Sequence, residues 1–190
     1  MNNAERIVRE LDSRLDHSVR LILYGRAAIA LGFETPPPQT LLSLDVDVII
    51  PLSEVEPLHN DLVFWAAQAA TNEALGSAGL YITHLFTAAD VFLRRNWEQH
   101  LVPIRLAGMR SLRLFRPATI DLVLTKMMRG ADPIDRSDLQ FLIAAGNLSV
   151  PEINEALAEV VLPDVPELRE LFEQARPIVL ELAAANEPKN

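Results

Sequence analysis

The chain of 190 residues contains no cysteine, only seven glycines and few aromatic residues (6%). The absence of cysteine excludes disulfide bonds and thiolate metal sites, and it leaves the redox compartment open. No uninterrupted apolar run approaches the ~18 residues that a membrane-spanning helix requires. Eight charged residues between positions 5 and 20 are not compatible with a secretory signal. These absences together predict a cytoplasmic protein with no membrane partner.

The hydrophobic share of 49% is large enough to build a full core in one domain with a helical extension. The net charge of −9 argues against general nucleic-acid binding, but the charge is unevenly distributed. The charged residues within 91–130 are mostly basic, and those within 147–190 are mostly acidic. The basic segment could receive a triphosphate or an RNA end. Alternatively, its arginines could pair with the acidic C-terminal helices, which could also form a partner surface.

Residues 43–50, Ser-Leu-Asp-Val-Asp-Val-Ile-Ile, have the alternation of a half-buried strand. Asp45 and Asp47 would share one strand face, about 6.5 Å apart along the backbone, while Leu44, Val46, Val48 and Ile50 would form core. Two like charges on one face repel each other. A divalent cation held by carboxylate oxygens would remove that repulsion; simple exposure of both groups to water is the alternative.

A short apolar strand at 21–24 precedes a small-residue helix at 25–32 that begins with Gly25. A glycine at a strand-to-helix turn lets the backbone approach a ligand closely, and a helix N-terminus favours phosphate. A turn suited to phosphate is therefore followed, one connection later, by a strand with paired carboxylates.

This arrangement resembles the nucleotidyltransferase superfamily, whose fold is shared with DNA polymerase beta, and within it the uncharacterised prokaryotic branch related to toxin and abortive-infection proteins. Gly25 matches the glycine of the family's turn, Ser43 the hydroxyl position, and Asp45 and Asp47 the carboxylates. The resemblance covers roughly residues 19 to 145. It implies that Asp45 and Asp47 hold Mg²⁺ and that Gly25, Arg26 and Ser43 contact the nucleotide of an NTP substrate.

The family pattern continues with a helix that carries a lysine and with an Asp-x-x-Asp-Leu helix start, matched here by Lys126 and residues 135–139. An ammonium at Lys126 could offset the phosphate charge that develops during transfer. The alternative is a lysine that extends its head to solvent.

The sequence departs from the family at three positions. Arg26 replaces the small second residue of the turn, where it could pair with phosphate or fill the pocket. Leu41 stands where an arginine is often found. His84 occupies the place, on a strand predicted at 80–86, where nucleotide-transferring members usually have a third carboxylate.

The spacing of apolar residues and the positions of glycine, proline and helix-capping residues predict the remaining elements. Helices are expected at 3–16, 54–75, 117–129, 137–145, from 150 and from 166, with a short one through residues 92–93. Gly130 is expected to end the helix at 117–129, and Ser137 or Asp135 to cap the next one. Ser149 and Glu152 predict a capping box at the start of the helix from 150, and Pro177 predicts a kink in the last helix. A hairpin is expected from residues 101–106 and 111–115, with Pro103 marking an edge strand. The triple proline at 36–38 predicts a stiff loop before the aspartate strand.

The sequence therefore predicts an α+β fold: a small mixed nucleotidyltransferase-type sheet flanked by helices in residues 1–116, then a helical bundle in residues 117–190. The predicted function is Mg²⁺-dependent transfer of a nucleoside monophosphate to a hydroxyl on an RNA, a protein or a small molecule. Arg26 and His84 favour a second interpretation, a catalytically degenerate binding module of a toxin–antitoxin or regulatory pair. A purely structural protein is the third.

Overall fold

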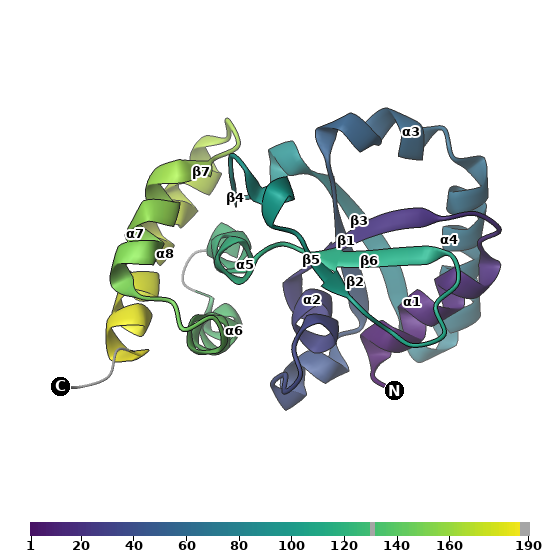
Figure 1. The fold of residues 1–190 in the computed structure, drawn as a ribbon, viewed down its shortest axis with the longest axis horizontal. Coiled ribbons are helices and arrows are strands. Elements are labelled where there is room, and N and C mark those ends of the chain that lie inside the picture. The colour runs from purple at the N-terminus through teal and green to yellow at the C-terminus, as the bar shows by residue number, and fades with distance from the viewer. Residues whose placement is uncertain (130–131, 187–190) are drawn as a thin grey trace. The chain divides into compact units, whose positions relative to one another are not determined.

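The computed structural model describes residues 1–129 and 132–186, apart from the side chains of Thr83 and His84. Its fold is α+β, with a mixed sheet and a helical C-terminal region (Figure 1). The chain divides into two compact units, Met1–Thr87 with Leu101–Arg116, and Ala88–His100 with Pro117–Asn190. The segment 88–100, which the sequence placed with the N-terminal region, belongs to the second unit.

The first unit is built on a five-stranded sheet in the order β3-β2-β1-β6-β5. Its strands are β1 (Val19–Tyr24), β2 (Asp45–Ile50), β3 (Tyr81–Thr87), β5 (Val102–Ile104) and β6 (Leu112–Arg116). The pairs β1–β2 and β5–β6 are antiparallel, whereas β1–β6 and β2–β3 are parallel. β5 lies at an edge, as Pro103 predicts.

The two faces of this sheet differ because successive side chains of a strand alternate. One face is buried and is apolar apart from Arg116 of β6, and the helices α1 (Asn3–Arg14), α2 (Gly25–Gly32) and α4 (Leu62–Leu75) pack on the sheet (Figure 1). The register places the following residues on the opposite face, here called the Asp47 face: Arg20, Ile22, Tyr24, Asp45, Asp47, Ile49, Arg113 and Phe115. Every charged residue of β1 and β2 is on the Asp47 face.

The free edge of the sheet at β3 is blocked by side chains of α4. Asn72 Nδ2 donates to the carbonyl of Ile82 at 2.9 Å, and the N–H of Ile82 donates to Asn72 Oδ1 at 2.8 Å. Gln68 Nε2 donates to the same carbonyl at 2.6 Å. These amides satisfy backbone groups that an edge strand otherwise presents to a neighbouring chain.

Two predicted helical segments take a different form. The helix predicted at 54–75 is interrupted, and α3 (Val55–His59) is separate from α4, because Asp61 caps α4 by accepting the N–H of Phe64 at 2.9 Å. The short helix predicted through residues 92–93 is wrong: Leu93–Arg94 is the strand β4, paired with β7 (Val160–Val161). A two-residue strand leaves no alternation to detect.

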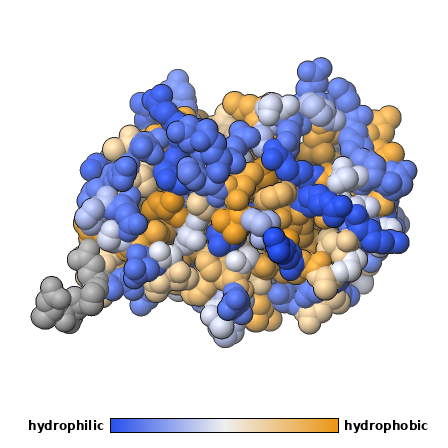
Figure 2. All heavy atoms as spheres, viewed as in Figure 1, coloured by the Kyte–Doolittle hydropathy of each residue, from blue (hydrophilic) through white to orange (hydrophobic). Residues whose placement is uncertain are grey.

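The second unit contains α5 (Thr119–Lys126), α6 (Pro133–Ala145), α7 (Val150–Glu159) and α8 (Pro166–Asn186). Ser149 and Glu152 form the predicted capping box of α7, and Pro177 lies inside α8 as predicted. The cap of α6 is Asp132, not Ser137 or Asp135, because Pro133 occupies its first position. The predicted helix end at Gly130 lies outside the described residues. The outer surface of α7 and α8 is mostly hydrophilic (Figure 2).

Within the described ranges, no helix combines the length and the apolar character needed to cross a bilayer.

A buried carboxylate fastens the β5–β6 hairpin to α1. Asp12, only 4% exposed, accepts the backbone N–H groups of Arg110, Ser111 and Leu112 at distances down to 2.7 Å. Burial by itself opposes ionisation of Asp12, but these three N–H donors outweigh it and hold the pKa of the carboxyl below its usual range.

We expect Asp12→Ala to lower the free energy of unfolding by about 3 kcal/mol, because it leaves buried N–H donors without acceptors. Urea unfolding followed by circular dichroism measures the change, with Glu10→Ala on the exposed side of α1 as control. Since the folded pKa of Asp12 is depressed, its contribution is present at neutral pH and is lost as the pH falls below 3.8 through the folded value. Equal urea midpoints for the two variants would contradict this role.

Candidate functional site

The paired aspartates project from one strand, as their spacing predicts. Asp45 and Asp47 are both half-buried, and they alternate with the buried Val46 and Val48. Asp47 is the register partner of Tyr24, the last residue of β1. Both carboxylates therefore lie on the Asp47 face, near the point where β1 gives way to α2.

Gly25 brings the turn after β1 against Asp47. Its φ of +62° is in the left-handed region, which L side chains rarely adopt. A Cβ placed on Gly25 would lie 3.3 Å from Asp47 Oδ2, so the missing side chain makes room for the carboxylate. Arg26 follows in the first turn of α2 and is half-buried. The predicted pairing of a glycine turn with the aspartate strand is thus present in the fold.

Ser43 holds the other carboxylate. Its Oγ donates to Asp45 Oδ1 at 2.8 Å, which fixes one oxygen and leaves the second for another partner. The triple proline leads into a 3-10 turn, Pro38–Leu42, and the N–H of Ser43 donates to Thr40 O at its end. Leu44, predicted as core, is 51% exposed because the strand begins only at Asp45.

Aromatic side chains flank the carboxylates on the same face. Tyr81 is the register partner of Asp45 and is 37% exposed. Tyr24, opposite Asp47, makes an edge-to-face contact with Phe86 at 5.9 Å between ring centroids. The neighbourhood therefore offers two carboxylates, a hydroxyl and aromatic rings.

The strand beside β2 is irregular opposite Asp47. β3 has two residues, Thr83 and His84, between the pairs Val46–Ile82 and Val48–Leu85, where β2 has one. The side chain of His84, at the predicted third-ligand position, lies outside the described residues. Among the side chains that are described, no three His, Cys, Asp or Glu residues gather as metal ligands. Among the described side chains, the fold therefore brings two carboxylates together here, and two carboxylates are ligands that Mg²⁺ can use together with substrate phosphates and water.

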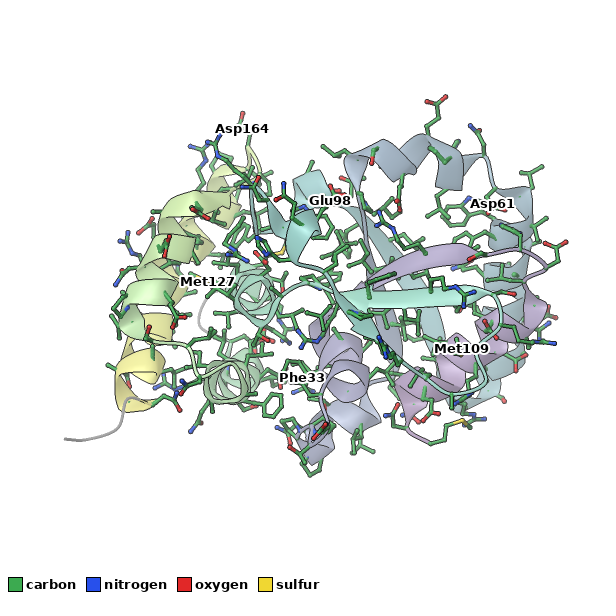
Figure 3. All side chains as sticks on the ribbon, viewed as in Figure 1. Phe33, Asp61, Glu98, Met109, Met127 and Asp164 are labelled. Carbon is green, nitrogen blue, oxygen red and sulfur yellow. The ribbon has the colours of Figure 1, made fainter. Side chains whose placement is uncertain are left out.

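Lys126, predicted to assist transfer, is a member of a buried ion cluster in the second unit. Its Nζ donates to Asp135 Oδ1 at 2.8 Å and to Asp138 Oδ2 at 2.7 Å, and the two aspartates are 2% and 0% exposed. Arg129 Nε also donates to Asp135, at 2.5 Å, and this bond raises the pKa of Arg129. Neighbouring Met127 is buried (Figure 3). Lys126 thus fastens α5 to α6 rather than extending to solvent.

A third buried carboxylate of this unit, Asp121, forms an ion pair that the sequence did not reveal. Asp121, 0% exposed, accepts Arg94 Nε at 2.9 Å and Nη2 at 2.8 Å, together with the N–H of Arg94. The bidentate bond raises the pKa of Arg94. The partners are 27 residues apart, so no local spacing reveals the pair.

No protein-family model, curated protein or solved structure matches the chain significantly.

We expect Gly25→Ala to lower the free energy of unfolding by about 1 to 2 kcal/mol, because alanine is strained at positive φ. The matched control is Gly76→Ala, at φ −59° with nothing within 4 Å of the added Cβ, which should be neutral or slightly stabilising. Chemical unfolding of both variants measures the difference. A Gly25→Ala variant as stable as Gly76→Ala would show that the turn can rearrange.

We expect Lys126→Met to lower the free energy of unfolding by about 3 to 5 kcal/mol, since it removes the ammonium that bridges the buried carboxylates of Asp135 and Asp138. Arg136→Met is the control, because the Arg136–Glu181 pair is exposed and such pairs contribute about 1 kcal/mol or less. Thermal and urea unfolding report the outcome. A small effect at Lys126 would mean that Arg129 alone compensates both aspartates.

Proposed function

We propose that this protein is a Mg²⁺-dependent nucleotidyltransferase-like protein, which transfers a nucleoside monophosphate from an NTP to a hydroxyl acceptor. The observation that carries the proposal is the pair Asp45 and Asp47 on one strand face, with Asp47 Oδ2 3.3 Å from the place that a Cβ of Gly25 would occupy. A carboxylate pair next to a glycine turn joins cation ligands to a backbone that phosphate can approach.

Each residue of the site has a part in this proposal. Asp45 and Asp47 would hold Mg²⁺, which supplies charge neutralisation of the triphosphate when bound. Ser43 orients Asp45 through its hydrogen bond. Gly25 and Arg26 would contact phosphate from the backbone and from the side chain.

The reaction itself is a phosphoryl displacement. The acceptor oxygen forms a bond to the α-phosphorus of the NTP, the bond from that phosphorus to the bridging oxygen breaks, and pyrophosphate leaves with its electron pair. The acceptor hydroxyl loses its proton to water or to a carboxylate. Tyr81 and Tyr24 are aromatic neighbours against which a base could stack.

The second candidate is a catalytically degenerate binding module that keeps this fold. The engagement of Lys126 with Asp135 and Asp138 favours it, because a residue expected to assist transfer already has a structural role. Its partner would be a protein that docks on the acidic C-terminal helices, as in a toxin–antitoxin or regulatory pair.

Thermal unfolding with each of the four NTPs, with Mg²⁺ or with EDTA, tests the proposal. We expect one or more NTPs to raise the melting temperature only with Mg²⁺, by a free energy that reaches about 2.7 kcal/mol at a hundredfold excess over Kd. Asp45→Asn and Asp47→Asn, which keep the side-chain shape, should abolish the shift.

Glu73→Gln, an equal charge change at an exposed site on α4, should retain the full shift. Stabilisation that persists in EDTA, or that both asparagine variants retain, would exclude the metal site. Mg²⁺-dependent binding without pyrophosphate release in the presence of any acceptor would favour the binding module.

A further inference from the structure

Three arginines lie in line across the first unit's sheet. Arg20 on β1 is the register partner of Arg113 on β6. On the other side of β6, Ile104 pairs with Leu114, so Arg105, the next residue after β5, continues the line opposite Arg113. This set, the arginine row, consists of Arg20, Arg113 and Arg105, and all three are exposed. Neighbouring strands are about 4.8 Å apart, so the row sets three like charges side by side.

Most of this positive charge is not compensated by nearby acids. Arg20 forms an ion pair with Glu54. Arg105 and Arg113 have neither a hydrogen bond nor an ion pair to any side chain that the structure describes. Residues 101–116 contain four arginines and no aspartate or glutamate. Like charges directly opposite each other destabilise a sheet, so the row favours an anionic ligand.

Three basic residues of the middle segment, Arg94, Lys126 and Arg129, form ion pairs within their own unit. Their partners are Asp121, Asp135 and Asp138, not residues of the acidic segment 147–190 that the sequence offered as the alternative. Arg105 and Arg113 do not follow that pattern. Their charge is available at the surface, although the chain as a whole is acidic.

An apolar cavity accompanies the arginine row. It has a volume of about 260 Å³ within the β5–β6 hairpin, and Pro103, Met109 and Phe115 line it together with Arg105 and Arg113. Met109 is in the loop that joins the two strands (Figure 3). Over this hairpin, strongly hydrophilic side chains lie across an apolar surface (Figure 2). Pockets that enclose a whole ligand are typically ~300–1,000 Å³, so this cavity suits one planar group of a larger molecule.

We propose that the arginine row and this cavity bind a single-stranded nucleic acid. Guanidinium groups recognise successive phosphates bidentately, and a base enters the cavity against Phe115. Repeated cations beside an aromatic and apolar surface are the two elements that single-strand binding requires. An acidic peptide would match the charges but would leave the apolar cavity without a planar group to fill it.

The surface lies on the same sheet face as the carboxylates. Arg20 is four residues before Tyr24, the partner of Asp47, which is about 13 Å along β1. If the proposed transferase function holds, on which this step rests, the bound strand is the acceptor class. The binding itself requires neither NTP nor Mg²⁺.

Fluorescence anisotropy with a short labelled single-stranded RNA, and with DNA of the same sequence, tests the binding in EDTA without NTP. We expect the affinity to fall as salt rises. Arg105→Gln/Arg113→Gln should weaken binding about tenfold or more, and should reduce the slope of log K against log salt by about 1.4, which is ~0.7 for each lost phosphate contact. The melting temperature of this double variant should be equal to or higher than that of the wild type, because the repulsion between neighbouring guanidinium groups is relieved.

The matched control is Arg6→Gln/Arg14→Gln, the same charge change on the exposed side of α1, which should keep the wild-type affinity and slope. Asp45→Asn/Asp47→Asn should also bind normally, so that loss of NTP binding and loss of strand binding are distinguishable. An unchanged slope for the arginine variant would overturn the proposal. An equal loss of affinity in the control variant would also overturn it. Binding of polyglutamate in place of nucleic acid, or self-association of the protein that the arginine variant abolishes, would overturn it as well.

Discussion

The alternation of side chains along β1, β2 and β6 governs the chemistry of the first unit. One face of the sheet is sealed by apolar residues, so each charged residue of β1 and β2 has to emerge on the other. This single constraint places Asp45, Asp47, Arg20 and Arg113 on a common surface, although they come from three separate segments. The arginines and the aspartates therefore lie on the same sheet face but at different positions along β1, the arginines near its start and the aspartates near its end.

In the second unit, by contrast, several charged side chains are buried and paired with each other. Asp121, Asp135 and Asp138 are almost fully buried, and each is matched by a guanidinium or an ammonium. Pairs of this kind add little net stability compared with an apolar core, but removing one partner is costly. They fix which helix surfaces meet. On the Asp47 face of the first unit, in contrast, Asp45 and Asp47 are only half-buried and Arg20 and Arg113 are exposed.

The sequence was most informative where a local pattern carried the structure. Alternation identified β2, the glycine turn identified the start of α2, and Ser149 with Glu152 identified the start of α7. The sequence did not reveal interactions whose partner residue is far away along the chain. Nothing around Lys126 indicates that aspartates nine and twelve residues later return to its ammonium. Likewise Asp12 resembles an ordinary exposed helix residue until the hairpin, about a hundred residues later, is placed on it. The arginine row needs the strand register, which a single segment does not contain.

The amides of Gln68 and Asn72 on the outer side of β3 have a consequence for the protein at high concentration. They occupy the groups of Ile82 through which a sheet would recruit an additional strand from another molecule. Growth of the sheet by stacking copies edge to edge is thereby discouraged at this side. On the opposite side, the proline of β5 removes a donor and has a similar effect. The sheet is thus terminated at both margins by its own sequence, which protects a protein of 49% hydrophobic composition against fibre formation.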